Sequence, residues 1–287
     1  MNIEILHPGV SSTIQDLGRL NGLAYGVPKC GAMDPLLLKY GNALVGNPIS
    51  YPGIELTISG GKFKFLNDGH CAVVGNSLSI LLNGVTRLGN QKMEVKKGDV
   101  LSVGHLQTRY AYLVTQGRLE ADSYWGSFST YELVQRGGYQ GRRLLKGDVL
   151  SVKKTPETVQ KVNFPVKKEL IRVYPGPEFN LFSAHDITHF VSEFFNVSIN
   201  SNRMGYRLDG KILDSVKNLS IISAGVIPGT IQVPPSGYPI VLMADSPCTG
   251  GYPRFAVVHP EDIGSLAQIL PGEDVKFIWC YDQDKEV

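Results

Sequence analysis

The chain has 287 residues, of which 43% are hydrophobic and 19% are charged, and its 32 glycines and 17 prolines are numerous. Because typical domains carry about 25% charged residues and roughly 7% Gly, this composition favours short buried strands joined by tight turns, and it excludes a helical bundle, a coiled coil or a disordered chain. The formal net charge of +2 gives no electrostatic reason to expect nucleic acid or a membrane as a partner.

Short apolar segments follow one another along the chain, separated by Gly, Asn, Asp or Pro, as is typical of strands joined by turns. We expect strands at 3–6, 54–58, 62–66, 77–82, 109–115, 170–174, 219–223, 230–233, 239–243 and 274–280. The segment Lys97–Val103 recurs without change as Lys146–Val152. Two copies are too few for a solenoid, so we expect a pair of equivalent strands in one barrel or sandwich.

Three helices are expected between the strands. The first runs from Asp34 to about Val45, because Asp34 can cap a helix N-terminus and Pro35 suits the first helical position. A second is expected at about 186–195 and a third at about 261–270, where apolar residues recur at helical spacing. The sequence therefore predicts a mainly β protein with a few short helices.

A lysine-rich stretch divides the chain. Residues 153–169 hold five lysines and two prolines with little apolar periodicity, and similar strand-turn sequences, Ile3–Gly9 and Leu170–Gly176, open the two sides. We expect an N-terminal β-rich module at 1–155, a linker at 156–167 and a C-terminal β-rich module at 168–287.

The compartment is predicted from the cysteines and from the apolar runs. Cys30, Cys71, Cys248 and Cys280 are scattered without a C-x-x-C pair, which is typical of a reduced protein. No charged and apolar leader opens the sequence, and the longest apolar runs are far too short to span a bilayer. We expect a cytoplasmic protein.

Two incomplete motifs are interpreted as chance. Residues Gly205–Ile212 nearly match the phosphate-binding P-loop, but Ile212 replaces the hydroxyl residue that binds Mg²⁺, and the residues after Lys211 are a poor helix start. His185 and His189 have the i, i+4 spacing of zinc ligands, but no third ligand is identifiable. We interpret the two histidines as a solvent-facing helix side and predict no metal site.

Residues 245–253, after the apolar strand at 239–243, are the richest in candidate chemistry. Asp245 offers a base or a charge partner, Thr249 a hydroxyl donor, and Gly250 with Gly251 lets backbone N–H groups approach an anion. Cys248 lacks an adjacent base or cation in sequence, so we interpret it as a buried thiol and not as a nucleophile.

Two further polar clusters are candidates. Arg203 and Arg207 flank a glycine-containing turn, and their guanidinium groups suit a carboxylate or a phosphate, although ordinary surface charge explains the spacing equally well. Residues 15–19 form a compact polar cluster, whereas Asp34 is interpreted as a helix cap. The absence of G-x-S-x-G, G-x-G-x-x-G and A-M-K-M leaves a serine hydrolase, a Rossmann dehydrogenase and a biotin carrier without support.

Taken together, these segments resemble the biotin-dependent carboxyltransferase-like family, whose members are called the C subunit of 5-oxoprolinase, allophanate hydrolase subunit 2 or the antagonist of the Kip inhibitor of a sporulation kinase. Each motif is weak alone, but the set occurs in family order over nearly the whole chain. The matching segments are 8–9, 13–19, 26–28, 31–34, 41–47, 126–130 apart from Phe128, 203–208, 229–234, 243–245 and 249–253.

The resemblance implies two cyclophilin-like β-barrel modules and a complex with the B subunit of 5-oxoprolinase, which is like allophanate hydrolase subunit 1, and with the A subunit. Such a complex opens 5-oxo-L-proline to L-glutamate with ATP, whose site lies on another chain of the complex or is shared with one. The related alternative is carboxyl transfer to urea or a similar amide, with biotin carried on another chain. A third hypothesis is a regulatory protein that sequesters a kinase inhibitor.

The resemblance also implies a set of site residues for a small amide substrate. The expected catalytic residues are Asp245, Thr249, Arg203 and Arg207, with Asp245 the first choice as general base. The expected substrate-binding residues are Gln15, Asp16, Arg19, Tyr206, Gln232, Gly250, Gly251 and Tyr252.

Three positions depart from the family pattern. Asn202 stands where Asp is usual, and Cys248 stands where Thr is usual. Phe128 stands where the family usually has Arg between two serines, so the chain lacks a positive charge there. This third departure bears on the choice among the amide substrates.

Overall fold

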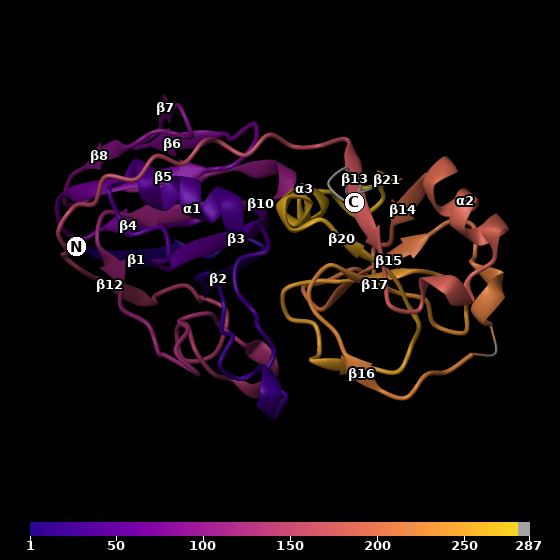
Figure 1. Ribbon diagram of the computed structural model, residues 1–287. Coiled ribbons are helices and arrows are strands. Elements are labelled where there is room, and N and C mark those ends of the chain that lie inside the picture. Colours follow the sequence, from indigo (N-terminus) through magenta and orange to yellow (C-terminus); the bar gives the residue numbers. More distant parts are fainter. Residues whose placement is uncertain (218, 281–287) are drawn as a thin grey trace. The chain divides into compact units, whose positions relative to one another are not determined.

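The computed structural model describes residues 1–217 and 219–280 of a mainly β protein (Figure 1). Its contacts divide the chain into two compact units. The first comprises Met1–Asn21 and Cys30–Pro165, and the second comprises Gly22–Lys29 and the chain from Val166. The main change of unit after Pro165 falls within the expected linker at 156–167, whereas the sequence did not predict that Gly22–Lys29 groups with the second unit.

The first unit consists of two antiparallel sheets. The seven-stranded sheet has the order β11-β12-β1-β4-β9-β6-β7, and the five-stranded sheet has the order β2-β3-β10-β5-β8. The strands are β1 Asn2–His7, β2 Ser11–Gln15, β3 Gly53–Ser59, β4 Lys62–Phe65, β5 Gly69–Val74, β6 Ile80–Leu82, β7 Val85–Arg87, β8 Met93–Val95, β9 Val100–Val103, β10 His105–Thr115, β11 Arg118–Leu119 and β12 Val149–Lys153. A 3₁₀ turn, η2, spans Glu132–Val134.

The repeated heptapeptide forms two equivalent strands of the larger sheet. In one copy β9 pairs with β4, in the other β12 pairs with β1, and β1 and β4 pair with each other at the centre. Leu101 and Leu150, at the same place in the two copies, are both buried in one core. The prediction of an equivalent strand pair in one sandwich is confirmed.

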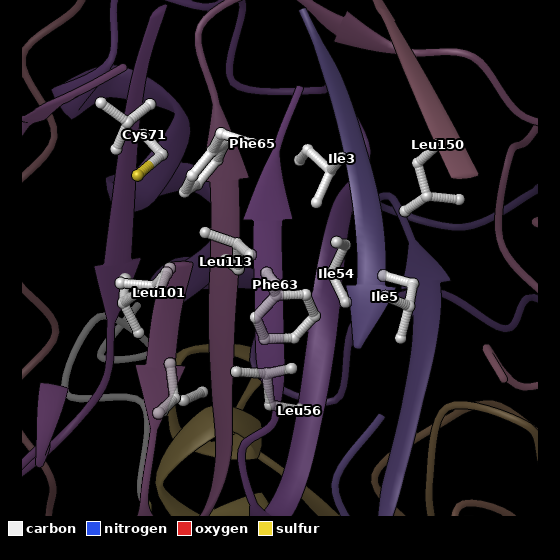
Figure 2. Packing of buried hydrophobic residues seen from close by; sticks show 14 of the residues in the cluster. Ile3, Ile5, Ile54, Leu56, Phe63, Phe65, Cys71, Leu101, Leu113 and Leu150 are labelled. Carbon is white, nitrogen blue, oxygen red and sulfur yellow. The ribbon is translucent and has the colours of Figure 1, made fainter. Parts of the chain in front are cut away.

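Alternating apolar residues from both sheets of the first unit enclose a common core. Figure 2 shows Ile3 and Phe65 of the larger sheet together with Leu113 and Cys71 of the smaller one. These side chains are fully buried, and burial of an Ile, Leu or Phe side chain contributes about 1.5–3 kcal/mol relative to exposure.

A single α-helix, α1 Pro35–Leu44, belongs to the described part of the first unit. Asp34 accepts a hydrogen bond from the backbone N–H of Leu37 at 3.1 Å, and Pro35 occupies the first helical position. The predicted first helix and its cap are therefore confirmed. Leu37 and Leu38 pack in a second apolar cluster with residues of β5 and β10.

The second unit is built on a closed barrel with the order β13-β20-β17-β18-β15-β14-β21. The parallel pair of β13 and β21 completes the ring. The barrel strands are β13 Leu170–Pro175, β14 Phe195–Val197, β15 Gly205–Asp209, β17 Thr230–Gln232, β18 Ile240–Leu242, β20 Arg254–Val258 and β21 Asp274–Trp279. A separate ribbon pairs β16 Ala224–Gly225 with β19 Thr249–Gly250.

Short helices accompany the barrel. They are α2 Ala184–Ser192, α3 Ile263–Ala267 and the 3₁₀ turns η1 Leu23–Tyr25, η3 Phe179–Leu181, η4 Asp214–Val216 and η5 Pro260–Asp262. Phe190 of α2 fixes that helix to the barrel, because its ring lies 4.7 Å from the ring of Phe277 and 4.9 Å from that of Phe255 between centroids.

The predicted mainly β fold with short helices is confirmed, with three local differences. The second helix begins earlier, at Ala184, because Ser183 caps it through the N–H of Asp186, and it ends at Ser192, so that Phe195 belongs to strand β14. The third is divided into η5 and the short α3. The strand expected at 219–223 is irregular, and β16 begins after it at Ala224. None of the helices in the described ranges has the length and apolar character needed to cross a membrane.

Candidate functional site

In the second unit, a two-pronged ion pair joins two of the predicted catalytic residues. Arg203 donates from Nε to Oδ2 of Asp245 at 2.8 Å and from Nη2 to Oδ1 at 2.9 Å. The side chains are 18% and 13% exposed. The pairing of β15 with β18 brings the two segments together, and the N–H of Asp245 also donates to the carbonyl of Arg203 at 2.9 Å.

This geometry bears on the role of Asp245. Both carboxylate oxygens already accept charge-assisted hydrogen bonds, which are short and orient a guanidinium group firmly. A general base needs an oxygen directed at the proton that it removes. The ion pair therefore favours an orienting role for Asp245, whose carboxylate holds the guanidinium of Arg203 in place.

The ribbon after Asp245 carries a second group of predicted residues. Gly250 lies against the buried Gln232, because a Cβ added at Gly250 would stand 2.5 Å from Nε2 of Gln232. That amide nitrogen donates to the carbonyl of Tyr252 at 3.2 Å. A glycine at position 250 thus allows the backbone to approach the side chain of Gln232 closely. The side chains of Thr249 and Tyr252 are exposed on the same segment.

Other neighbours in this segment have clearer structural roles. Gly251 accepts through its carbonyl from the N–H of Ile221 at 3.2 Å. Partial burial raises the pKa of the Cys248 thiol, so the thiol stays protonated near neutral pH. A protonated thiol is a poor nucleophile, which agrees with the interpretation of Cys248 from the sequence.

Tyr206 and Arg207 are neighbours on β15 and lie on opposite faces of the strand. Tyr206 is fully buried, and its hydroxyl donates to the carbonyl of Ala267 at 2.8 Å. Arg207 is exposed. The structure therefore gives Tyr206 a packing role in the barrel and leaves Arg207 accessible to a ligand.

Sequence reasoning missed the pair that anchors the ribbon. Arg254 donates from Nε and Nη2 to the Glu178 carboxylate at 2.8 and 2.6 Å, and from Nη1 to the carbonyl of Gly225 at 2.8 Å. Gly225 belongs to β16, the partner of β19. No local pattern identifies Glu178, because it lies 76 residues from Arg254.

In the first unit, Asp16 organises the loop that contains Phe128. Its Oδ1 accepts from the hydroxyls of Ser127 and Ser129, both at 2.6 Å, and from the N–H of Gly18 at 2.8 Å. Its Oδ2 accepts from the N–H of Phe128 at 2.7 Å. With these four bonds and 6% exposure, Asp16 holds β2 and the 126–130 segment together.

Arg19 and Gln15 complete this group, and each retains an unused polar atom. Arg19 is 1% exposed and donates to the carbonyls of Tyr124 and Ser129, but its Nη1 has no partner. Gln15 is equally buried, and its Oε1 has none. These two atoms are among several buried polar atoms of the first unit that have capacity left for a ligand.

Of the predicted residues, Gln15, Asp16 and Arg19 all contact the 124–130 segment of the first unit, and the second unit contains two pairs, Arg203 with Asp245 and Gln232 with Gly250. Ser127 and Ser129 were missed as partners of Asp16, although the flanking Gly126 and Thr130 belong to the same sequence motif. Comparison with known proteins identifies the family of the chain. Residues 25–279 match the model of a family described as the carboxyltransferase domain, subdomains A and B.

The chain belongs to this carboxyltransferase domain family. It is 35% identical to the 5-oxoprolinase C subunit of Haemophilus influenzae over 278 residues, which cover 96% of this chain and 90% of that protein. It is also 35% identical to the 5-oxoprolinase C subunit of Escherichia coli, with 97% of this chain and 91% of that protein covered.

A solved structure of the family has the same fold. The crystal structure of the K. lactis urea amidolyase matches 98% of this chain with a TM-score of 0.89 and 30% identity. The match covers 19% of that longer protein. This carboxyltransferase domain fold therefore occurs both as a separate protein of similar length and as a part of a larger enzyme.

Proposed function

We propose that this chain is the C subunit of an ATP-dependent 5-oxoprolinase, which hydrolyses 5-oxo-L-proline to L-glutamate as part of a complex. The observation that carries the proposal is the similarity to two 5-oxoprolinase C subunits over about nine-tenths of their length. A chain of the same extent supports a shared role more strongly than a match to a small part of a larger enzyme.

The substrate of this reaction carries a cyclic amide and a carboxylate. Arg203, oriented by Asp245, and the exposed Arg207 are the groups that we propose for an anionic substrate, because guanidinium forks match carboxylates. The backbone at Gly250 and Gly251 is proposed to approach the amide oxygen, on which negative charge develops when the ring opens. Thr249 is proposed as a hydroxyl donor beside them.

Within the first unit, Arg19 and Gln15 are proposed as a polar binding group of their own. The unpaired Nη1 of Arg19 supplies a donor and the unpaired Oε1 of Gln15 supplies an acceptor for polar groups of a ligand. Leaving either atom unpaired in a buried position costs about 1–3 kcal/mol. A ligand that pairs both removes this cost.

The proposed enzyme needs other chains. ATP supplies the free energy for opening a stable amide, and its site is proposed to lie on another chain of the complex or to be shared with one. The P-loop resemblance at 205–212 does not fit ATP in the P-loop manner, because residues 205–209 form β15 and no α-helix begins at Lys211. We propose the B and A subunits of 5-oxoprolinase as partners in the cytoplasm.

The test is to co-express the chain with its B and A partners and to measure glutamate formation from 5-oxo-L-proline with ATP. We expect turnover that is lost in Arg203→Gln. The matched control is Arg143→Gln, because Arg143 is an exposed arginine that pairs with Glu132 in the first unit. A well-folded complex without turnover, or an Arg203→Gln complex with the wild-type rate, would contradict the proposal.

A second candidate is a carboxyltransferase component that acts on urea or a related amide. The family description and the urea amidolyase structure favour it. The sequence contains no A-M-K-M site, so biotin is proposed to be carried on another chain. Urea-dependent loss of carboxyl groups from a carboxylated biotin carrier, with no reaction of 5-oxo-L-proline in the full complex, would make this the correct function.

A further inference from the structure

A cavity in the second unit unites two motifs that the proposed function does not use. Its volume is about 420 Å³, and its lining includes His185, Asp186 and His189 of α2, Lys211 after β15, Asp214 of η4, and Tyr238. His185 and His189 are the pair with the i, i+4 spacing of zinc ligands, and Lys211 belongs to the incomplete P-loop match at 205–212. Residues far apart in sequence are thus placed around one space suited to a small ligand.

The carboxylates of this cavity are already engaged. Asp186 accepts from the backbone N–H of Ser215 at 2.9 Å and also from the Ser215 hydroxyl. Asp214 pairs with Lys217 at 2.8 Å. Both carboxylates therefore have partners within the protein, of which only Lys217 carries a positive charge.

The donors of the cavity have capacity left. His189 Nε2 is buried and makes no hydrogen bond within the described residues, and the His189 ring stacks on His185 with 5.5 Å between centroids. Lys211 makes a 3.7 Å ion pair with Glu193, but their side chains are 67% and 47% exposed. Such exposed pairs contribute about 0–1 kcal/mol, so Lys211 can exchange this partner for a ligand.

A metal ion fits these groups less well than an anion does. Over residues 1–217 and 219–280, no group of three or more His, Cys, Asp or Glu is placed to hold a metal. Zinc sites in proteins use at least three protein ligands, and the ammonium group of Lys211 repels a cation. The two imidazoles and the ammonium group instead offer several N–H donors to one acceptor-rich ligand.

We propose that this cavity binds a tetrahedral oxyanion of the phosphate type, held by His185, His189 and Lys211. A phosphate group brings several acceptor oxygens and a negative charge, which match the free donors at the cavity wall. The buried Nε2 of His189 then gains the partner that it lacks in the protein alone. The proposal does not depend on the 5-oxoprolinase assignment, because it concerns equilibrium binding to the chain itself.

The test is a calorimetric titration of the full chain with inorganic phosphate, with sulfate and with ATP. We expect saturable binding that is at least about tenfold weaker in Lys211→Gln, because a charge-assisted hydrogen bond contributes about 1.5–3 kcal/mol. His189→Ala should weaken binding in the same direction. Lys146→Gln and His105→Gln are matched controls on exposed residues of the first unit and should bind like wild type.

Titration with sulfate at about pH 6 and pH 8 separates an anion site from a metal site, because imidazoles gain a proton over this range. The charged and titratable groups at the cavity are the two histidines, Lys211, Asp186, Asp214 and Tyr238, together with Glu193 and Lys217, the ion-pair partners of Lys211 and Asp214. Anion binding should therefore tighten several-fold at pH 6. A metal bound by neutral imidazoles would instead bind more tightly at pH 8.

The outcomes are decisive in both directions. Tighter binding of ATP than of phosphate would identify a nucleotide as the source of the oxyanion, and equal binding would identify free phosphate; both support the site. No saturation up to about 10 mM of any probe, which corresponds to less than about 3 kcal/mol of binding free energy, overturns it. Binding unchanged by Lys211→Gln and His189→Ala, or zinc binding that strengthens with pH, also overturns it.

Discussion

Replacing Asp245 tests whether this carboxylate orients Arg203 or removes a proton. In Asp245→Ala the guanidinium of Arg203 loses the two hydrogen bonds of 2.8 and 2.9 Å that fix its plane. In Asp245→Asn one acceptor oxygen remains, and the amide cannot act as a base. Arg203→Lys keeps the charge but loses the two-pronged geometry.

The magnitude follows from the burial of the pair. Exposed ion pairs contribute about 0–1 kcal/mol, whereas breaking a buried pair costs about 3–5 kcal/mol. With side chains 18% and 13% exposed, this pair lies between the two cases, and we expect Asp245→Ala to lower the free energy of unfolding by about 2 kcal/mol. A displaced guanidinium should reduce turnover by about 10²–10³-fold, as the loss of one well-placed donor does.

The assay is glutamate formation by the assembled complex at several pH values, combined with thermal unfolding of the isolated chain. If Asp245 orients Arg203, Asp245→Asn retains part of the activity and the acid limb of its pH profile, and the effects of Asp245→Ala and Arg203→Lys are not additive. If Asp245 is the base, Asp245→Asn is as inactive as Asp245→Ala and the acid limb disappears. That second result would refute the orienting role.

Two other changes test single contacts. Asp262 accepts from Lys168 and Arg172; burial would raise the pKa of Asp262, but these hydrogen bonds outweigh burial and lower it from 3.8 to about 2. The free energy of unfolding of Asp262→Asn should therefore be about 2 kcal/mol lower than that of the wild type at pH 7. Denaturant titrations should show this difference shrinking as the pH falls from about 4 to 2. A difference that is independent of pH would contradict the prediction. Gly250→Ala should displace Gln232 and lower turnover without unfolding the barrel, as measured by activity and circular dichroism; an unchanged rate would show that their close approach is not needed.

The fold was predictable where local chemistry decides it. Asp34 and Pro35 predicted the start of α1, and the repeated Lys97–Val103 sequence predicted two equivalent strands, because caps and alternating patterns act over a few residues. The expected strand at 219–223 was wrong because an apolar segment forms a strand only when a partner strand is adjacent. In this region the pairing with β19 begins later, at Ala224.

The contacts within the candidate site also could not be predicted, because they join residues that are distant in sequence. Residue types and motifs pointed to Arg203 and Asp245, but their ion pair spans 42 positions and depends on the register of β15 against β18. The serines that hold Asp16 lie more than 110 positions away from it. Spacing along the chain contains no information on such contacts, which only the completed sheets determine.

Asp16 and Asp245 illustrate what the partners of a side chain add to its identity. Both are acidic residues that follow a strand, β2 for Asp16 and β18 for Asp245, and the sequence placed both in the site. Asp16 accepts four bonds from neutral hydroxyl and N–H donors, which ties two segments of the first unit together. The side chain of Asp245 accepts two bonds from one guanidinium and thereby fixes the plane of a positively charged group. The oxygens of Asp16 are thus used in hydrogen bonds that stabilise the fold, whereas Asp245 orients the positively charged group of Arg203. This difference makes Arg203 a stronger candidate than either aspartate for direct contact with substrate.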